Sequence, residues 1–356
     1  MNEHILSTET QATLLLCGVF GGEPSSIHPL TLAEFNKLEQ WLTGEGFTLS
    51  TLIETKLEEL IENLRSGGFD VERLSALLSR GSAMAIAVER WTNIGLWVLS
   101  RSDEEYPQRL KSRLKQAAPA ILYGAGNRQL LSRGGLAVIG SRNADEAALS
   151  FARTVGEVCA QQDIQVISGG ARGVDSEAML GALERGGYAL GVLSGNLAHE
   201  MVSGECRSYL ADERLTLLSP FHPKAVFNVW SAMERNKLIY AMADFALVVS
   251  AELNKGGTWS GAIENLKKGW VPLLVRDDES AADGNRGLIK RGGIAIETNA
   301  IQPEVPLLEK LKNLAELQGT TLGPKNKSAE SEEQLSFRWS QKESPKPRKK
   351  SKKKPT

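Results

Sequence analysis

Short apolar runs recur along the second part of the chain, and each is followed by a glycine-containing turn and then by a helical pattern. Strands that are buried on both faces have such nearly continuous apolar runs, because neither set of side chains faces water. The alternation of strand, turn and helix predicts an α/β fold with a doubly wound parallel sheet. The predicted strands cover residues 136–139, 164–167, 189–193, 245–249 and 271–275, and predicted helices such as 146–161 and 176–185 lie between them.

Residues 1–100 have a helical periodicity instead, broken only by a short predicted strand at 95–99. Thr31 and Glu34 have the spacing of a capping box, which marks the start of a helix. Gly67-Gly68 ends one predicted helix, and the next begins at Val71. Apolar residues at helical spacing support this interpretation: Leu52, Leu57, Leu60, Ile61 and Leu64.

The end of the chain has a different composition from the rest. After a last predicted helix over 307–317, residues 319–356 are rich in Gly, Pro, Lys, Ser and Glu, and we predict that they are disordered. Eight Lys or Arg residues and one Glu fall between 342 and 356, so this end is either an electrostatic arm for nucleic acid or a solubilising tail. We therefore expect an N-terminal helical domain (1–100), an α/β domain (101–318) with a lead-in segment (101–134), and a disordered basic tail (319–356).

Composition limits the classes of protein to which the chain can belong. The net charge is −1, but without the basic end the chain has 34 basic and 42 acidic residues, so a nucleic-acid site in the body must be a local patch. The apolar stretch 12–20 is too short for a membrane helix and no Lys or Arg precedes it, so we expect a cytoplasmic protein without membrane association. Three cysteines without CxxC spacing and four histidines without an HxxxH pair predict neither a disulfide framework nor a metal site.

Four glycine-containing turns follow the predicted strands. Gly140-Ser141-Arg142 follows the first strand, residues 168–175 the second, residues 194–196 the third, and residues 254–261 the fourth, where a helix begins. Glycines let backbone N–H groups approach an anion, and Arg142 offers a guanidinium that suits phosphate. In an open parallel sheet the ligand binds beyond the carboxyl ends of the strands, which is where these turns lie. The candidates for phosphate contact are Gly140, Ser141, Arg142, Ser168, Gly169, Gly170, Arg172, Gly173, Lys255, Gly256, Gly257 and Thr258.

Two other positions in and beside these turns have alternative interpretations. Asp175 is a poor neighbour for phosphate, and we expect it to cap a helix or to orient Arg142 or Arg172. Trp259 either stacks on a base or packs in the interior. A further pair, Gly124-x-Gly126, lacks the third glycine of a dinucleotide fingerprint, since Gln129 stands there, so we expect no cofactor.

Several short motifs occur together in an order that resembles the DprA/Smf family of DNA-processing proteins. Each motif is weak alone, and the set covers about residues 100–297. The motifs are Tyr106-Pro107 with Arg109-Leu110, the stretch 119–127, Gly140-Ser141-Arg142, Ser168-Gly169 with Ala171 and Gly173-Val174-Asp175, Arg235-Asn236-Lys237, and Gly284-Asn285 with Leu288-Ile289 and Gly293.

This resemblance implies an extended Rossmann-like domain that binds single-stranded DNA and forms a homodimer. It also implies a role in natural transformation, in which such proteins hand the strand to a RecA-type recombinase. The resemblance adds Arg235, Asn236 and Lys237 to the candidate DNA-binding residues. Backbone amides and cations of this kind hold phosphates without reading base sequence.

Two alternatives come from other functional classes. Nucleotide phosphoribohydrolases resemble this chain in a Gly-Gly-x-Gly-Thr-x-x-Glu loop, but Trp259 follows Thr258 here and the nearest acid, Glu264, is one turn late. With no paired acid and base among the turns, we expect a protein without catalytic residues. The other alternative is a nucleotide-sensing or antitoxin-type regulator in a defence locus, with a cognate toxin as partner. Departures from the family pattern favour it, including Met179 where His is usual and no winged-helix domain after residue 320.

Overall fold

The structure, a computed structural model, describes residues 6–21, 28–54 and 57–319. The predicted disordered tail lies outside these residues, except for Gly319. The described residues belong to one compact unit, Met1–Pro324. The boundary between two domains near residue 100 stays a prediction. No helix in the described ranges is both long and apolar enough to span a membrane.

Helices make up the N-terminal part of the chain, as the periodicity predicts. The capping box at the start of α2 is confirmed: the Thr31 hydroxyl accepts from the Glu34 N–H (3.3 Å), and the Glu34 carboxylate accepts from the Thr31 N–H (2.7 Å). The helix expected from Val71 is also confirmed. The helices in the described part of this region are α1 (Thr8–Cys17), α2 (Leu32–Gly44), α3 (Thr51–Glu54), α4 (Leu57–Ser66), α5 (Val71–Leu78) and α6 (Gly81–Asn93).

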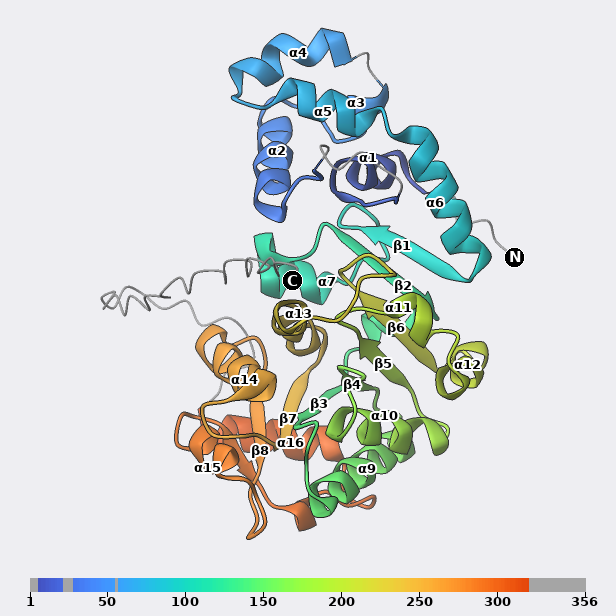
Figure 1. Cartoon of the computed structure of the whole chain (residues 1–356). Coiled ribbons are helices and arrows are strands. Elements are labelled where there is room, and N and C mark those ends of the chain that lie inside the picture. The colour runs from blue at the N-terminus through green and yellow to red at the C-terminus, as the bar shows by residue number, and fades with distance from the viewer. Residues whose placement is uncertain (1–5, 22–27, 55–56, 320–356) are drawn as a thin grey trace, which may run out of the picture. The chain divides into compact units, whose positions relative to one another are not determined.

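A nine-stranded, mostly parallel sheet follows in the described chain, in the order β1-β2-β6-β5-β4-β3-β7-β8-β9 (Figure 1). This confirms the doubly wound α/β fold. β2 pairs antiparallel with both β1 and β6, so the sheet is not parallel throughout. The strands are β1 (Leu96–Ser100), β2 (Ile121–Gly126), β3 (Leu136–Gly140), β4 (Val166–Ser168), β5 (Ala189–Val192), β6 (Leu215–Ser219), β7 (Phe245–Ser250), β8 (Leu273–Arg276) and β9 (Ile294–Ile296).

Three of these strands are absent from the sequence-based prediction. β2 contains Gly124 and Gly126, which weaken the apolar signal, and Trp97 packs where a side chain at Gly124 would lie. β9 has only three residues, and β6 is a short run that the pattern did not single out. Their pairing depends on neighbouring strands that are distant in sequence, and the local pattern does not contain this information.

Helices cover both faces of the sheet. In β3, Leu136 and Val138 belong to one hydrophobic cluster, and Ala137 and Ile139 belong to the other. Residues 136–139 are therefore continuously apolar because both faces of β3 are buried, as the sequence predicted. The helices of this region are α7 (Gln108–Leu114), α8 (Leu130–Arg133), α9 (Glu146–Gln161), α10 (Val174–Glu184), α11 (Leu197–Glu200), α12 (Gly204–Ala211), α13 (Val229–Met242), α14 (Gly256–Lys268), α15 (Asp283–Ile289) and α16 (Leu307–Leu317), with 3-10 turns at Lys115–Ala117 and Thr298–Ala300.

The direction of the chain reverses next to β3. From β3 the chain builds β4, β5 and β6 on one side, and then returns to build β7, β8 and β9 on the other side. β3 and β7 are therefore neighbours whose carboxyl ends lead to diverging loops, and their register shifts between Ile139 and Gly140. Such a switch point is the usual ligand position in an open α/β sheet.

The N-terminal helices are joined to the sheet by polar and aromatic contacts. Asp103 accepts hydrogen bonds from the Thr10 hydroxyl (2.7 Å) and from the Ser100 N–H at the end of β1 (2.7 Å). Trp91 of α6 makes edge-on ring contacts with Tyr123 of β2 (5.3 Å between centroids) and with His222 (5.9 Å). His222 thus links α6 to the segment that leads into α13.

We expect the His222 contact to weaken in acid. Burial lowers the pKa of His222 below the ordinary value of 6.5, with a smaller contribution from Lys224, and its Nδ1 accepts the Lys224 N–H (3.2 Å). Because the unfolded chain binds this proton more readily, the contribution of His222 to stability is complete above pH 6.5 and is lost as the pH falls below it. Thermal unfolding at pH 7.5 and 5.5 tests this: His222→Phe should lose less stability on acidification than the wild type. An equal loss in both proteins would contradict it.

Candidate functional site

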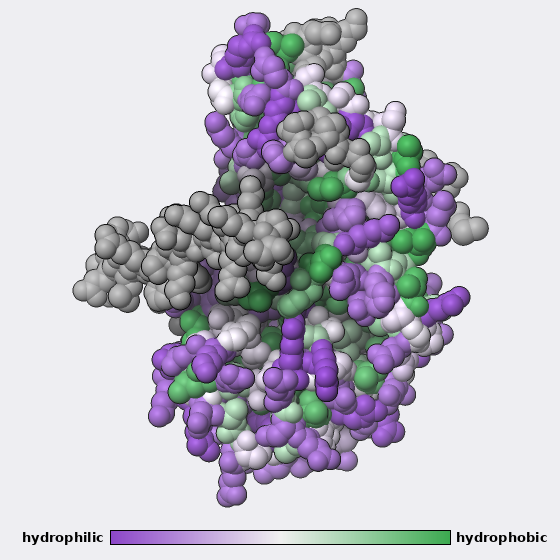
Figure 2. All heavy atoms as spheres, in the orientation of Figure 1, coloured by the Kyte–Doolittle hydropathy of each residue, from purple (hydrophilic) through white to green (hydrophobic). Residues whose placement is uncertain are grey.

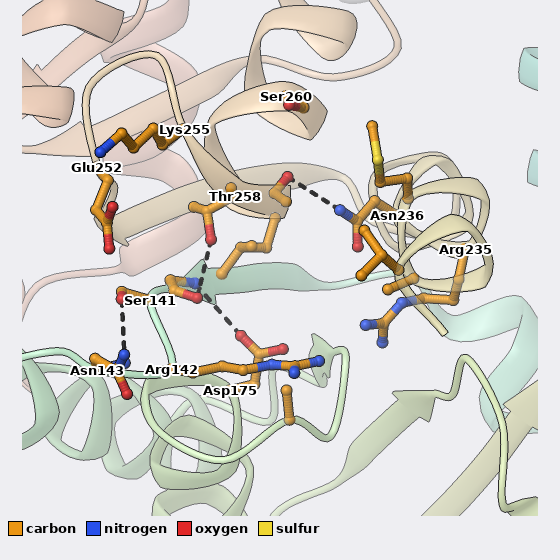
Figure 3. Close-up of a pocket in the computed structure, with 18 of the residues that line it drawn as sticks. Ser141, Arg142, Asn143, Asp175, Arg235, Asn236, Glu252, Lys255, Thr258 and Ser260 are labelled. Atoms are coloured by element: carbon orange, nitrogen blue, oxygen red, sulfur yellow. Dashed lines mark hydrogen bonds between the residues drawn. The ribbon is translucent and has the colours of Figure 1, made fainter. Parts of the chain in front are cut away.

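A cavity of about 460 Å³ opens at the switch point between β3 and β7. Figure 3 shows its three walls: the turn after β3 with Ser141 and Arg142, the start of α14 with Lys255 and Thr258, and α13 with Asn236. The residues around it are Ile139, Gly140, Ser141, Arg142, Asn143, Ala171, Asp175, Phe227, Val229, Ala232, Met233, Arg235, Asn236, Glu252, Lys255, Gly256, Gly257, Thr258 and Ser260.

The turn after β3 is fixed by hydrogen bonds to three other segments. The Gly140 N–H donates to Asp175 (3.3 Å), and the Thr258 hydroxyl donates to the Gly140 carbonyl (2.9 Å). The Ser141 N–H donates to the Ser250 carbonyl at the end of β7 (2.9 Å). A Cβ at Gly140 would lie within 2.7 Å of the Val174 side chain, so this close approach needs glycine. The turn therefore holds Arg142 at a defined place on the rim.

The start of α14 forms the second wall. Lys255 is its N-cap residue and no side chain caps the helix there, while Gly256 has a φ of +78°, a conformation that suits glycine. The first N–H groups of a helix have no acceptor within it and carry partial positive charge. The Asn236 amide donates to the Gly257 carbonyl (3.0 Å), which ties this helix to α13. The arrangement presents backbone donors to the cavity, as anion sites at helix N-termini do.

Two buried side chains of opposite charge, Asp175 and Arg235, form part of the cavity wall. Asp175 and Arg235 are 6% and 4% exposed. The Arg235 guanidinium donates to the carbonyls of Gly169 (2.6 Å) and Val192, and Asp175 also accepts from the Gly169 N–H (3.2 Å). Burial raises the pKa of Asp175 while the charge of Arg235 opposes the rise, and burial lowers the pKa of Arg235 to about 10. The pair thereby connects the loops after β3, β4 and β5 to α13.

This geometry gives Asp175 a different partner from the one that the sequence suggested. We expected it to cap a helix or to orient Arg142 or Arg172. Instead it accepts from the turns after β3 and β4, and its charged neighbour is Arg235. Arg235 in turn is engaged with backbone carbonyls.

The other predicted phosphate-binding residues divide into two groups. Gly140, Ser141, Arg142, Asn236, Lys255, Gly256, Gly257 and Thr258 lie around the cavity together. The remaining residues are not part of its lining. The Ser168 hydroxyl is buried and donates to the Val138 carbonyl (2.6 Å), Gly169 holds Arg235, Gly173 is buried, and Lys237 pairs with Glu234 (2.6 Å). Gly170 and Arg172 are exposed on the same loop as Ala171.

The turn after β5 does not reach the cavity. The Asn196 N–H donates to the Ala225 carbonyl (2.7 Å), so this turn supports the segment before α13. The open question about Trp259 is answered by its burial: it is 7% exposed, with Arg291 over its ring at 5.1 Å, and it packs in the interior.

The sequence analysis missed part of the lining. The Arg142 guanidinium lies over the Phe227 ring at 4.6 Å from its centroid, which fixes the cation at the rim. Phe227 precedes α13 and follows no glycine motif, so no local signal pointed to it. The lining contains two acids, of which Asp175 is buried and Glu252 is exposed. It contains three basic residues, of which Arg142 and Lys255 are exposed and Arg235 is buried.

Fold and site together define a class: an α/β protein of Rossmann type with a cavity at its switch point that exposed cations and the start of a helix line. A family model, DNA recombination-mediator protein A, matches residues 97–303. The match covers more than half of the sequence, and the chain belongs to this family.

Named relatives agree with this assignment. The DNA processing protein DprA of Bacillus subtilis is 25% identical over 207 residues, which cover 57% of this chain and 68% of that protein. Protein Smf of Escherichia coli is 27% identical over 203 residues, or 56% of this chain and 54% of Smf. The X-ray structure of DprA from Streptococcus pneumoniae shares the fold, with a TM-score of 0.54 and 21% identity over 79% of this chain and 98% of that one.

Proposed function

We propose that this protein binds single-stranded DNA and that the phosphates of the strand lie in the cavity between β3 and β7. The observation that carries the proposal is the meeting of the uncapped start of α14 with two exposed cations, Arg142 and Lys255, around one cavity. Backbone donors and cations of this kind bind phosphate without reading base sequence. The family membership and the DNA-processing names of the relatives support DNA as the polymer.

In this proposal the remaining residues take supporting roles. Ser141, Asn236, Gly256, Gly257 and Thr258 shape the phosphate site or donate to it. Ser168, Gly169, Gly173, Asp175 and Arg235 hold the loops in place, while Gly170 and Arg172 extend the contact along the exposed loop after β4. Lys237 is paired with Glu234, so its charge is balanced locally and it contributes least to binding.

The proposed role is non-catalytic. Asp175 is engaged with two backbone N–H groups, and Glu252 is the exposed carboxylate of the lining. Asp175, the other carboxyl of the lining, is buried, and no histidine is among the residues around the cavity. In this proposal the protein acts as a homodimer. It protects the bound strand and delivers it to a RecA-type recombinase. A cognate toxin would be the partner if the cavity served a regulatory role instead.

A binding titration across a salt series tests the proposal. We expect single-stranded DNA and duplex both to bind more tightly than a mononucleotide, because several phosphates of a polymer contribute at once. The proposal assigns the tighter binding of the two polymers to single-stranded DNA. The logarithm of the binding constant should fall linearly with the logarithm of salt concentration, with a slope of about −0.7 for each phosphate neutralised. If a mononucleotide bound as tightly as an oligonucleotide, the nucleotide-sensing alternative would replace this proposal.

A further inference from the structure

Exposed hydrophobic side chains gather at the start of α13 and in the segment before it. Val226 is 76% exposed, Val229 71%, Trp230 65%, Met233 48% and Phe227 39%. Figure 2 shows hydrophobic residues near the middle of one face of the molecule. Clustered apolar side chains in water are unfavourable and usually mark a binding surface.

This cluster is continuous with the cavity. Phe227, Val229 and Met233 are themselves part of the lining, while Trp230 is beside them on the first turn of α13. Val229 and Met233 are one helical turn apart, so they share a face of the helix. A surface that begins at a phosphate site and continues as apolar and aromatic side chains matches the two chemical parts of a nucleotide strand.

The two aromatic residues of the cluster have different surroundings. The Arg142 guanidinium covers the Phe227 ring, so Phe227 positions the cation. Trp230 contacts Phe221, with ring centroids 5.9 Å apart in a tilted arrangement, and most of its side chain is exposed. The backbone beneath Trp230 is held by a capping box in which Asn228 accepts the Ser231 N–H (2.7 Å). Trp230 is thus an exposed ring on a firmly capped helical turn.

We propose that Trp230, flanked by Val229 and Met233, is a platform on which unpaired bases stack when the strand's phosphates occupy the cavity. This inference rests on the proposed DNA-binding function and adds how single strands are chosen over duplex. In a duplex the faces of the bases are already stacked on one another, whereas an unpaired base offers a free face to an aromatic ring. Stacking of this kind accepts any base, since every base has a π-face.

Continuity with the phosphate site favours bases over a protein partner as the occupant. The cluster is bordered by Arg142 and Asn236, which line the same cavity, and a strand bound there must place its bases within reach of the neighbouring surface. A second copy of the chain or another protein would bury the apolar residues without using the cations.

The test compares a strand that has bases with one that lacks them. We expect the wild-type protein to bind a 12-mer of deoxyadenosine more tightly than an abasic strand of equal length. Trp230→Ala should lower the affinity for the deoxyadenosine strand by about 5- to 150-fold, the range for stacking of one base, and leave the affinity for the abasic strand unchanged. Trp230→Phe should keep most of the affinity. Ile86→Ala, which removes a 49% exposed hydrophobic side chain from α6, is the matched control and should change neither affinity.

Each outcome decides between the two proposals. If wild-type protein bound neither strand, the phosphate site itself would be wrong. If it bound both strands equally, or if Trp230→Ala weakened both equally, the phosphate site would stand and the platform would be wrong. A change of oligomeric state in Trp230→Ala, measured by sedimentation, would assign the apolar cluster to a second copy. The comparison of the deoxyadenosine strand with the abasic strand uses wild-type protein, so it tests the platform even if a variant fails to fold.

Discussion

Replacing Arg142 and Lys255 together by alanine is expected to lower the affinity for single-stranded DNA by at least 100-fold at low salt. A hydrogen bond to a charged group contributes about 1.5–3 kcal/mol, so each single variant should lose about tenfold or more. The slope of affinity against salt should also become shallower, because fewer counterions are released. Titration of the wild type, both single variants and the double variant over a salt series measures both effects.

Lys268→Ala is the matched control for this experiment. Lys268 is exposed and lies in the last turn of the same helix, α14, whose start forms the phosphate site. Its removal should leave the affinity within about twofold, since an exposed charge at this distance is largely screened. The loss in the double variant should be the same for oligonucleotides of different sequence, because phosphate contacts do not read bases. An unchanged affinity in the double variant would place the DNA elsewhere on the protein.

Asp175→Ala is expected to cost about 3–5 kcal/mol of unfolding free energy, the usual result of breaking one side of a buried charge pair. The variant leaves the buried guanidinium of Arg235 without its opposite charge. It also removes the acceptor of the Gly140 and Gly169 N–H groups. A loss of this size is a large part of the stability of an ordinary protein. Urea unfolding followed by circular dichroism measures it.

Asp283→Ala serves as the control for the stability experiment. The Asp283 side chain is 82% exposed and lies 3.7 Å from Arg286, and such exposed pairs contribute at most about 1 kcal/mol. Asp175→Asn should fall between the two, since it keeps an acceptor oxygen but loses the charge. A stability of Asp175→Ala equal to that of the control would show that the buried pair does not hold the loops.

The assignment of roles to the two arginines depends on this pair. Arg142 and Arg235 both stand in motifs that suggest phosphate contact, and the sequence gives no reason to separate them. In the structure Arg142 lies over Phe227 at the rim, whereas Arg235 is 4% exposed and donates to backbone carbonyls. Loss of Arg142 should therefore affect binding first, and loss of Arg235 should affect folding first.

Much of the fold could be predicted because its signals are local. The helices α9 and α16 and the strand β3 follow from apolar periodicity, and the start of α2 follows from Thr31 and Glu34. The glycine turns after β3 and before α14 were also visible. Gly256 has a positive φ that other residues avoid, and Gly140 lies too close to the Val174 side chain for a larger residue. Strands β2, β6 and β9 were not predicted, because short segments take their conformation from their neighbours in the sheet.

The sequence by itself determined the class of the fold and the chemistry available at the ends of its strands. Only the tertiary structure decided which of those ends meet: the return of the chain from β6 to β7 places the start of α14 against the turn after β3, while the turn after β5 supports a neighbouring segment. It also decided that Trp259 is buried and Trp230 exposed. The physical reason is that burial and proximity arise from contacts between residues far apart in the chain, whereas periodicity and turn chemistry are properties of a few consecutive residues.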